Sequence, residues 1–147
     1  MPLLSPLDLE VIAAELRSYS EPAVNHSPAA GKWSAKEILG HLMDSAVNNH
    51  VRFIRAQAEN PLHIPGYDQE HWNRCQAYQQ VSWLELINLW LAYNLHIRRV
   101  LDLIPEATLG NMLVIGDGPR VTLQFVAEDY YEHLQHHIDQ IRALNQT

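Results

Sequence analysis

Residues 130–141 read Tyr-Tyr-Glu-His-Leu-Gln-His-His-Ile-Asp-Gln-Ile, and the interpretation of the whole chain starts from this run. Its apolar residues recur at steps of three and four, the spacing that places them on one face of an α-helix. On such a helix His133 and His137 lie one turn apart, where two imidazoles can reach a single metal ion. The run therefore predicts a core helix that carries two candidate metal ligands.

The face that carries these histidines extends along an expected helix over about residues 122–144. Val126, Tyr130 and Ile141 continue the face at helical spacing, so we expect it to point into the core. A competing series on the same helix is polar and should face water; its members are Asp129, Glu132, His136 and Asp139. His136 is therefore expected to be a poorer ligand, although it is adjacent in sequence to His137.

Start signals predict two more long helices upstream. Residues 33–42, Trp-Ser-Ala-Lys-Glu-Ile-Leu-Gly-His-Leu, place a glutamate three residues after Ser34, which is the reciprocal capping box of a helix N-terminus. We expect this helix to continue to about residue 58. The same pattern at Ser82 predicts a helix that ends near residue 104, because a proline follows.

A further helix and two connections are read from caps and helix breakers. Ser5 is expected to cap the first helix, with Pro6 at the first helical position, and this helix should end near Ser18. Residues 22–31 contain two prolines and a glycine that do not favour a continuing helix. Residues 105–119 contain three glycines and two prolines, which favours a loop or a small hairpin around residues 116–118.

These helices define the expected architecture. Between the second and third long helices, Asp68 can cap a short helix that ends near Tyr78. The chain shows no internal repeat, low-complexity tract or evident linker, and 47% of its 147 residues are hydrophobic. We therefore expect an all-α four-helix bundle with long connections, forming one domain over residues 1–147.

Composition restricts the partners and the compartment. The formal net charge is −7, so we expect no sequence-independent binding to nucleic acid. The longest apolar-rich stretch, residues 83–104, is interrupted by charged residues, and we expect no membrane span. Cys75 is the only cysteine and the N-terminus lacks the pattern of a secretory signal, which together favour a reducing, cytoplasmic location.

His41 is the third candidate metal ligand, and it begins a polar face on its helix. Ser45, Asn49 and Arg52 follow it at helical spacing. If this face points inward, its polar groups need partners, and a wet cavity that begins at His41 would supply them. Arg52 and Arg55 form a small basic group of the kind that usually faces solvent, so we expect Arg52 outside the core, or at the mouth of the cavity if that interpretation is wrong.

The pattern alone also allows a purely structural interpretation. Two histidines four residues apart on a helix are common, and His41 at the edge of a core is more often hydrogen-bonded than metal-bound. The histidines without comparable spacing are read as surface or loop residues, with His71 as the first exception because it borders Trp72; they are His26, His50, His63, His71 and His96.

Three segments together resemble the DinB-like superfamily of metal-dependent four-helix-bundle proteins. They are residues 33–42, residues 66–72 (Gly-Tyr-Asp-Gln-Glu-His-Trp) and residues 133–141, and their order and separation cover almost the whole chain. The resemblance implies an irregular up-down-down-up bundle, often dimeric, with a divalent metal at one end. Carried over residue by residue, it implies as metal ligands His41, His133 and His137.

The resemblance also implies an activity. The family includes transferases that use bacillithiol, mycothiol or a related low-molecular-weight thiol, and members assigned as hydrolases or isomerases. We therefore expect an enzyme that uses Zn²⁺ or Ni²⁺ to activate a thiol or a water against a small electrophilic substrate, and a homodimer. The candidate pocket residues are Asn49, Arg52, Tyr67 and Asp68.

Other interpretations remain open at this point. Asp68 can be a helix cap only, and the Trp72 indole can simply pin the connection to the bundle. The chain can be a noncatalytic metal-binding or small-ligand-binding protein of a stress response. It can also be a bundle that dimerises through an apolar face and keeps its histidines as polar core.

Overall fold

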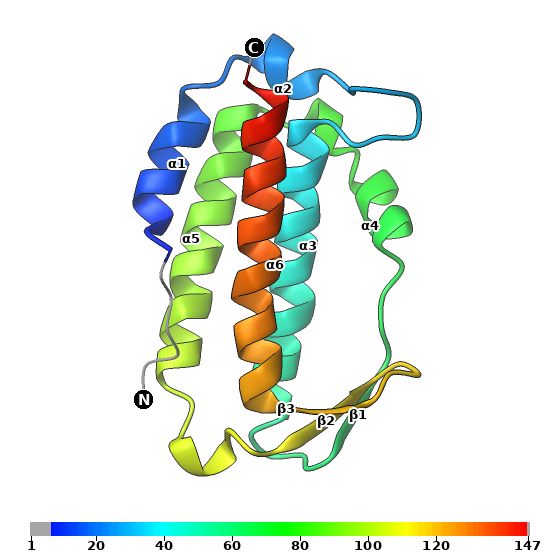
Figure 1. The fold of residues 1–147 in the computed structure, drawn as a ribbon, viewed down its shortest axis with the longest axis vertical. Coiled ribbons are helices and arrows are strands. Elements are labelled where there is room, and N and C mark those ends of the chain that lie inside the picture. Colours follow the sequence, from blue (N-terminus) through cyan, green and yellow to red (C-terminus); the bar gives the residue numbers. More distant parts are fainter. Residues whose placement is uncertain (1–6, 147) are drawn as a thin grey trace.

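The computed structural model describes residues 7–146 as a helical bundle with a small sheet at one end (Figure 1). Four long helices form the bundle: α1 (Leu9–Arg17), α3 (Ala35–Arg55), α5 (Trp83–Asp102) and α6 (Leu123–Leu144). The connections hold two short helices, α2 (Glu21–Asn25) and α4 (Gln69–Gln76), and two 3₁₀ turns, η1 (Tyr78–Gln80) and η2 (Glu106–Thr108). The strands are β1 (Leu62–Ile64), β2 (Met112–Ile115) and β3 (Arg120–Thr122).

The helix directions follow the expected up-down-down-up order. In Figure 1, α1 and α6 run away from the end of the molecule that carries the sheet, whereas α3 and α5 descend toward it. Because α3 and α5 are parallel neighbours, the chain has to return along the whole bundle between them. The crossover that contains β1 and α4 makes this return, and it passes beside α3 on the right of the view.

Side-chain caps set where the long helices begin. Ser34 forms the predicted capping box with Glu37, and Asp68 caps α4 as expected. The first helix starts later than predicted, at Leu9, because the Asp8 carboxylate accepts the backbone N–H of Val11 and caps it there. The predicted cap Ser5 and the predicted first helical residue Pro6 lie outside the described residues.

Two helix boundaries differ from expectation. The helix α3 ends at Arg55, three residues early, and the chain turns there with Arg55 paired to Glu59. A short helix, α2, occupies the stretch expected to be a connection. Ser20 caps it, and Pro22 lies in its first turn, where the missing N–H would have had no helical partner.

The small sheet extends what the glycine-rich stretch predicted. The expected hairpin is present as antiparallel β2 and β3, and Gly116 takes a φ of 57° in its turn. The strand β1 was not predicted; it pairs in parallel with β2, with Leu62 opposite Leu113. A three-residue strand has too few residues to show a period in sequence. Its partner also lies in a distant segment of the chain.

One continuous hydrophobic core fills the described part of the bundle. Its largest fully buried side chains include Trp83, Trp90 and Phe53. Gly40 of α3 lies directly against the ring of Tyr78 from η1, so the crossover packs on bare helix backbone. Over residues 7–146 no helix combines the length and hydrophobicity that a bilayer span requires.

Candidate metal centre

Three histidines meet between the two central helices α3 and α6. His41 lies in the N-terminal third of α3, and His133 and His137 lie at and beyond the middle of α6. The two helices run antiparallel and pack side by side, so residues 92 and 96 positions apart in sequence become neighbours. The structure thus brings together the three histidines that the sequence singled out.

The three imidazoles converge through their Nε2 atoms. His133 Nε2 lies 3.3 Å from His41 Nε2 and 3.1 Å from His137 Nε2. One ring nitrogen from each histidine lies within 4.8 Å of the others. Among the described residues, these three histidines form the group of histidine, cysteine or acidic side chains that lie close enough together to hold one ion.

The two separations from His133 fit a shared metal ion. Two nitrogens bound at ~2.1 Å to one ion, at tetrahedral or octahedral angles, lie about 3.0–3.4 Å apart. The distances from His133 Nε2 to His41 Nε2 and to His137 Nε2 fall in this interval. Three neutral imidazoles are also a donor set that zinc and nickel accept. The residues present therefore fit a divalent metal.

Burial keeps the cluster in its metal-binding protonation state. Burial, followed by repulsion from the other two histidines, lowers the pKa of His41 to about 3. Burial and the neighbouring His137 lower the pKa of His133 to about 4, and burial lowers the pKa of His137 as well. At neutral pH the three rings are uncharged, so each can present a lone pair to a cation.

The outer nitrogens of the rings fix their orientation. Gln140 Oε1 lies 2.6 Å from His137 Nδ1, so this nitrogen carries the proton and donates it, and Nε2 keeps its lone pair toward the cluster. His41 is 1% exposed, its ring packs against Trp33 at 4.9 Å, and its Nδ1 has no hydrogen-bond partner among the described residues. Nε2 is therefore the nitrogen through which His41 makes its polar contact.

A cavity of about 480 Å³ opens beside the cluster along the groove between α3 and α6. His133 lies at its histidine end, and α3, α6, the start of the crossover and the β2–β3 hairpin form its walls. Its lining residues are Ser45, Asn49, Arg52, Gly66, Tyr67, Gln69, Ile115, Gly118, Pro119, Val121, Phe125, Val126, Asp129, Tyr130 and His133. The polar face expected on α3 thus lines a cavity that contacts the histidine cluster.

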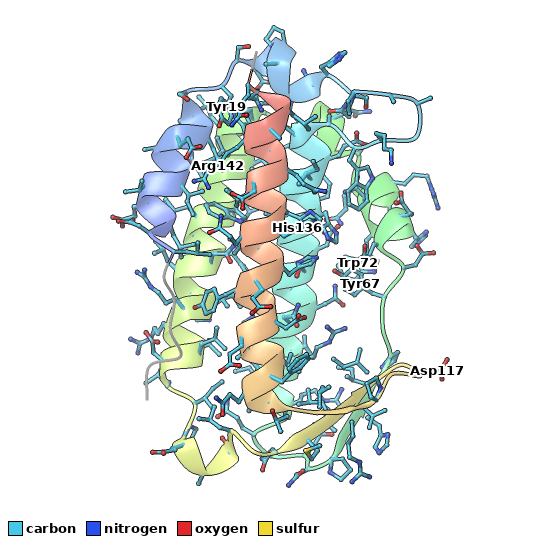
Figure 2. The ribbon with its side chains drawn as sticks, in the orientation of Figure 1. Tyr19, Tyr67, Trp72, Asp117, His136 and Arg142 are labelled. Carbon is cyan, nitrogen blue, oxygen red and sulfur yellow. The ribbon has the colours of Figure 1, made fainter. Side chains whose placement is uncertain are left out.

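Three of the four candidate pocket residues line this cavity. Asn49 and Arg52 come from α3, and Tyr67 reaches over from the crossover. Figure 2 shows Tyr67 beside Trp72, and their rings meet edge to face at 5.5 Å. Asp68 does not line the cavity; it is exposed, and its carboxylate caps α4 by accepting the backbone N–H of His71.

Arg52 is half-buried, and the expectation that it faces solvent is wrong. Its guanidinium lies in the cavity wall and donates to Asn49 Oδ1 at 3.3 Å, and burial lowers its pKa. Arg55, one turn later, is exposed and paired with Glu59, as expected for a solvated arginine. The helical phase separates the two: Arg52 continues the inward face of His41 and Ser45, whereas Arg55 does not.

Sequence reasoning missed two parts of the site. Asp129 was assigned to the water-facing series; it is exposed, yet it lines the cavity one turn before His133. Its i, i+4 spacing to a candidate ligand was the available signal. The hairpin residues Gly118 and Pro119 also line the cavity, and no local pattern could show that the hairpin folds back over α3 and α6.

The remaining histidines are not part of the cluster, although the ring of His136 lies 5.1 Å from the ring of His137. His136 is exposed on the outer face of α6, as predicted (Figure 2). His71 is exposed on α4 and contacts Cys75. His50 is half-buried, not a surface residue as expected; its Nδ1 lies 2.7 Å from the hydroxyl of Tyr93.

Known proteins resemble this chain in both sequence and fold. The family model of the DinB superfamily matches residues 9–141. An inferred metal-dependent hydrolase of Bacillus licheniformis is 27% identical over 142 residues, which are 95% of this chain and 78% of the relative. The solved structure of YfiT from Bacillus subtilis, described as a probable metal-dependent hydrolase with an unusual four-helix bundle topology, superposes with a TM-score of 0.83 at 21% identity. That superposition covers 94% of this chain and 82% of YfiT.

Proposed function

The chain belongs to the DinB superfamily, and on that premise we propose that it is a divalent-metal-dependent enzyme acting on a small electrophilic substrate. His41, His133 and His137 hold the ion, and Zn²⁺ or Ni²⁺ suits their nitrogens. The observation that carries the proposal is the convergence of three uncharged imidazoles, one of which, His133, lines a cavity of about 480 Å³. Three protein ligands leave room on the ion for a reactant, which distinguishes a catalytic site from a closed structural one.

When bound, a divalent ion supplies Lewis-acid chemistry that lowers the pKa of a coordinated water toward ~7 and holds a thiol as its thiolate. The chain's own residues then bind and orient the reactants. Asn49 and Tyr67 present polar groups into the cavity, and Phe125 and Val126 provide apolar walls. These contacts fit a small organic molecule with both polar and apolar parts.

We propose transfer of a low-molecular-weight thiol as the reaction. The thiolate sulfur attacks an electrophilic carbon, a sulfur–carbon bond forms, and the leaving group departs with its bonding electrons. Hydrolysis, which the names of the relatives suggest, uses water in the same place. Thiol transfer is favoured because a thiol held by the ion needs no base, whereas a bound water would have to rely on Asp129, the carboxylate that lines the cavity one turn before His133.

Metal content tests the site. Untagged protein purified without added metal should contain one divalent ion per chain. His41→Ala and His133→Ala should each lose it, whereas His136→Ala, which removes an exposed histidine from the same helix, should retain it. A protein without stoichiometric metal, or with metal that both variants retain, would contradict the assignment.

Turnover tests the reaction. Metal-loaded protein should accelerate consumption of bacillithiol, mycothiol or cysteine with monochlorobimane, and His133→Ala should abolish the acceleration. Metal-dependent hydrolysis of an ester or amide panel without thiol consumption would favour the hydrolase instead. Absence of both activities in a metal-loaded protein would identify a noncatalytic binder.

The proposal extends to assembly and location. We propose a cytoplasmic homodimer, supported by the family resemblance and by a single, exposed cysteine that suits a reducing compartment. Light scattering across a concentration series measures the mass. A monomer at micromolar concentration would rule out the dimer and leave the metal site unaffected.

A further inference from the structure

The cavity beside the histidines carries a separated charge pattern. Among its lining residues in the described chain, Arg52 is the only permanent cation and Asp129 is the only carboxylate. The two are not ion-paired, and Asp129 lies one turn before His133, at the histidine end. Arg52 lies at the other end, eleven residues after His41 along α3.

Arg52 is incompletely satisfied for a half-buried guanidinium. A guanidinium has five N–H donors. The structure gives it one side-chain acceptor, Asn49 Oδ1 at 3.3 Å, which is a neutral group at the long end of hydrogen-bond distances. No carboxylate of the described residues lies within ion-pair distance of Arg52, although half-buried charges are normally paired. Burial accordingly lowers the pKa of Arg52, which is the cost of a cation without a counter-charge.

Neighbouring groups complete a binding surface around this cation. Tyr67 lies close enough to Arg52 for its phenol and the guanidinium to interact electrostatically. Burial raises the pKa of Tyr67, so its hydroxyl stays protonated and can donate a hydrogen bond. Phe125 and Val121 supply apolar surface at the same end. A guanidinium fork next to a neutral O–H donor and apolar walls matches a carboxylate on an aliphatic or aromatic stem.

We propose that the Arg52 end of the cavity is a subsite for a carboxylate of the substrate. The inference rests on the proposed function, because it names the class of molecule that reaches the metal-binding histidines. One guanidinium balances one negative charge, and Asp129 in the same cavity disfavours a dianion such as a phosphate monoester.

The position of Arg52 also sets the size of the substrate. At ~1.5 Å per residue, His41 and Arg52 are ~16 Å apart along α3, and the reach of Arg52 back to Asn49 shortens this to roughly 12 Å. The substrate therefore carries its carboxylate several bonds away from the reacting atom. A two-carbon or three-carbon acid is too short to engage both ends.

Matched ligands test the subsite directly. Hexanoate, hexanamide and hexylphosphonate each contain six carbons, and calorimetry on wild-type protein should show that hexanoate binds about tenfold or more tightly than hexanamide, as expected for a charge-assisted hydrogen bond. Arg52→Gln should abolish this preference. Arg55→Gln removes the same charge from the exposed side of the same helix and should leave the preference unchanged.

Further arms separate the possible failures. Arg52→Lys, which keeps the charge, should retain part of the preference, and thermal melts establish that each variant is folded. Undetectable hexanoate binding, equal affinity for hexanoate and hexanamide, or a preference that survives Arg52→Gln would overturn the subsite. Tighter binding of hexylphosphonate would overturn the assignment to a carboxylate.

Metal-free protein distinguishes this inference from the proposed function. Arg52 does not contact the three histidines, so the preference for hexanoate should persist after chelation and in His41→Ala. Absence of metal-dependent turnover in metal-loaded wild-type protein, together with an intact preference for hexanoate, would refute the enzyme and leave the anion subsite standing. Intact turnover without the preference for hexanoate would refute the anion subsite and leave the enzyme standing.

Discussion

At the scale of single residues, the histidine cluster brings together ring nitrogens that cannot all present lone pairs to one another. His41 and His133 direct Nε2 atoms at each other at 3.3 Å inside the bundle, where their pKa values are about 3 and 4. Both rings are neutral at pH 7, so one must donate a proton or their lone pairs repel. A cation between them removes this conflict and leaves the Nδ1 atoms as the donors.

Gln140 gives the first prediction at this scale. It accepts from His137 Nδ1 and so holds the tautomer that leaves Nε2 free for metal. Gln140→Leu should weaken metal affinity by about tenfold or more, as removal of an outer hydrogen-bond partner does in other metal sites. Chelator competition measures the affinity. Gln135→Leu, which removes a half-buried glutamine bonded to Asp139 on the same helix, should have no effect, and equal affinity in both variants would contradict the role of Gln140.

Residue spacing showed part of the site and not all of it. The inward phase of α6 identified His133 and His137, and the phase of α3 identified Asn49 and Arg52 as one face. A helix has one period, so its faces can be read locally. Tyr67 lies in an irregular segment, where spacing gives no direction, and its place in the cavity required the three-dimensional path of the crossover.

At the scale of elements, the crossover is held to α3 by a close approach. A Cβ on Gly40 would overlap the ring of Tyr78, and that ring is fixed because its hydroxyl donates to Asp44 Oδ1. Asn73 of α4 adds a hydrogen bond to the backbone oxygen of Glu37 at 2.9 Å. These contacts set where the segment that carries Tyr67 and α4 lies against the bundle.

Gly40→Ala is therefore predicted to destabilise the fold by about 1–3 kcal/mol, the usual cost of overpacking, although alanine favours a helix. Urea unfolding measures the change. Gly110→Ala is the matched control, because a Cβ there meets nothing within 4 Å. Combining Gly40→Ala with Tyr78→Leu should recover part of the loss, and an unchanged stability in Gly40→Ala would show that the crossover does not pack on α3.

The ends of helices were predictable where a nearby side chain caps them. The capping serine Ser34 and the capping aspartate Asp68 each act within three residues, and both helix starts were correct. The strand β1 and the early end of α3 depend on contacts with distant segments, including the hydrogen bond from Asn111 to the backbone oxygen of Ala56. Such contacts leave no local pattern to read.

At the scale of the whole molecule, a salt bridge joins the first and last helices. Arg142 of α6 donates from two nitrogens to Glu15 of α1, at 2.7 and 2.9 Å, and Tyr19 donates to the same carboxylate. Figure 2 shows Tyr19 and Arg142 between the two helices. The pair holds α1 against α6, although its two residues are 127 positions apart in the sequence.

This pair predicts a pH dependence. The hydrogen bond from Arg142 lowers the pKa of Glu15 below its usual 4.5, so the stabilisation is present at neutral pH and is lost as the pH falls through that lowered value. Because both side chains are about one-third exposed, we expect no more than about 1 kcal/mol. A double-mutant cycle with Glu15→Gln and Arg142→Met, measured by urea unfolding, should show coupling at pH 7 that shrinks toward pH 3. Coupling that grows on acidification would contradict the assignment.

Metal should stabilise the whole bundle, not only its site. His41 belongs to α3 and His133 to α6, so an ion that binds both rings links segments that separate when the chain unfolds. Metal at 100 times its dissociation constant adds about 2.7 kcal/mol, which for a chain of this size raises the Tm by roughly 5–10 °C. Calorimetry of chelated and reloaded protein measures the shift. His136→Ala should show the full rise, because it spares the ligands, whereas His41→Ala should show none. An equal rise in both variants would mean that the ion binds elsewhere, and the three central histidines would then be polar core.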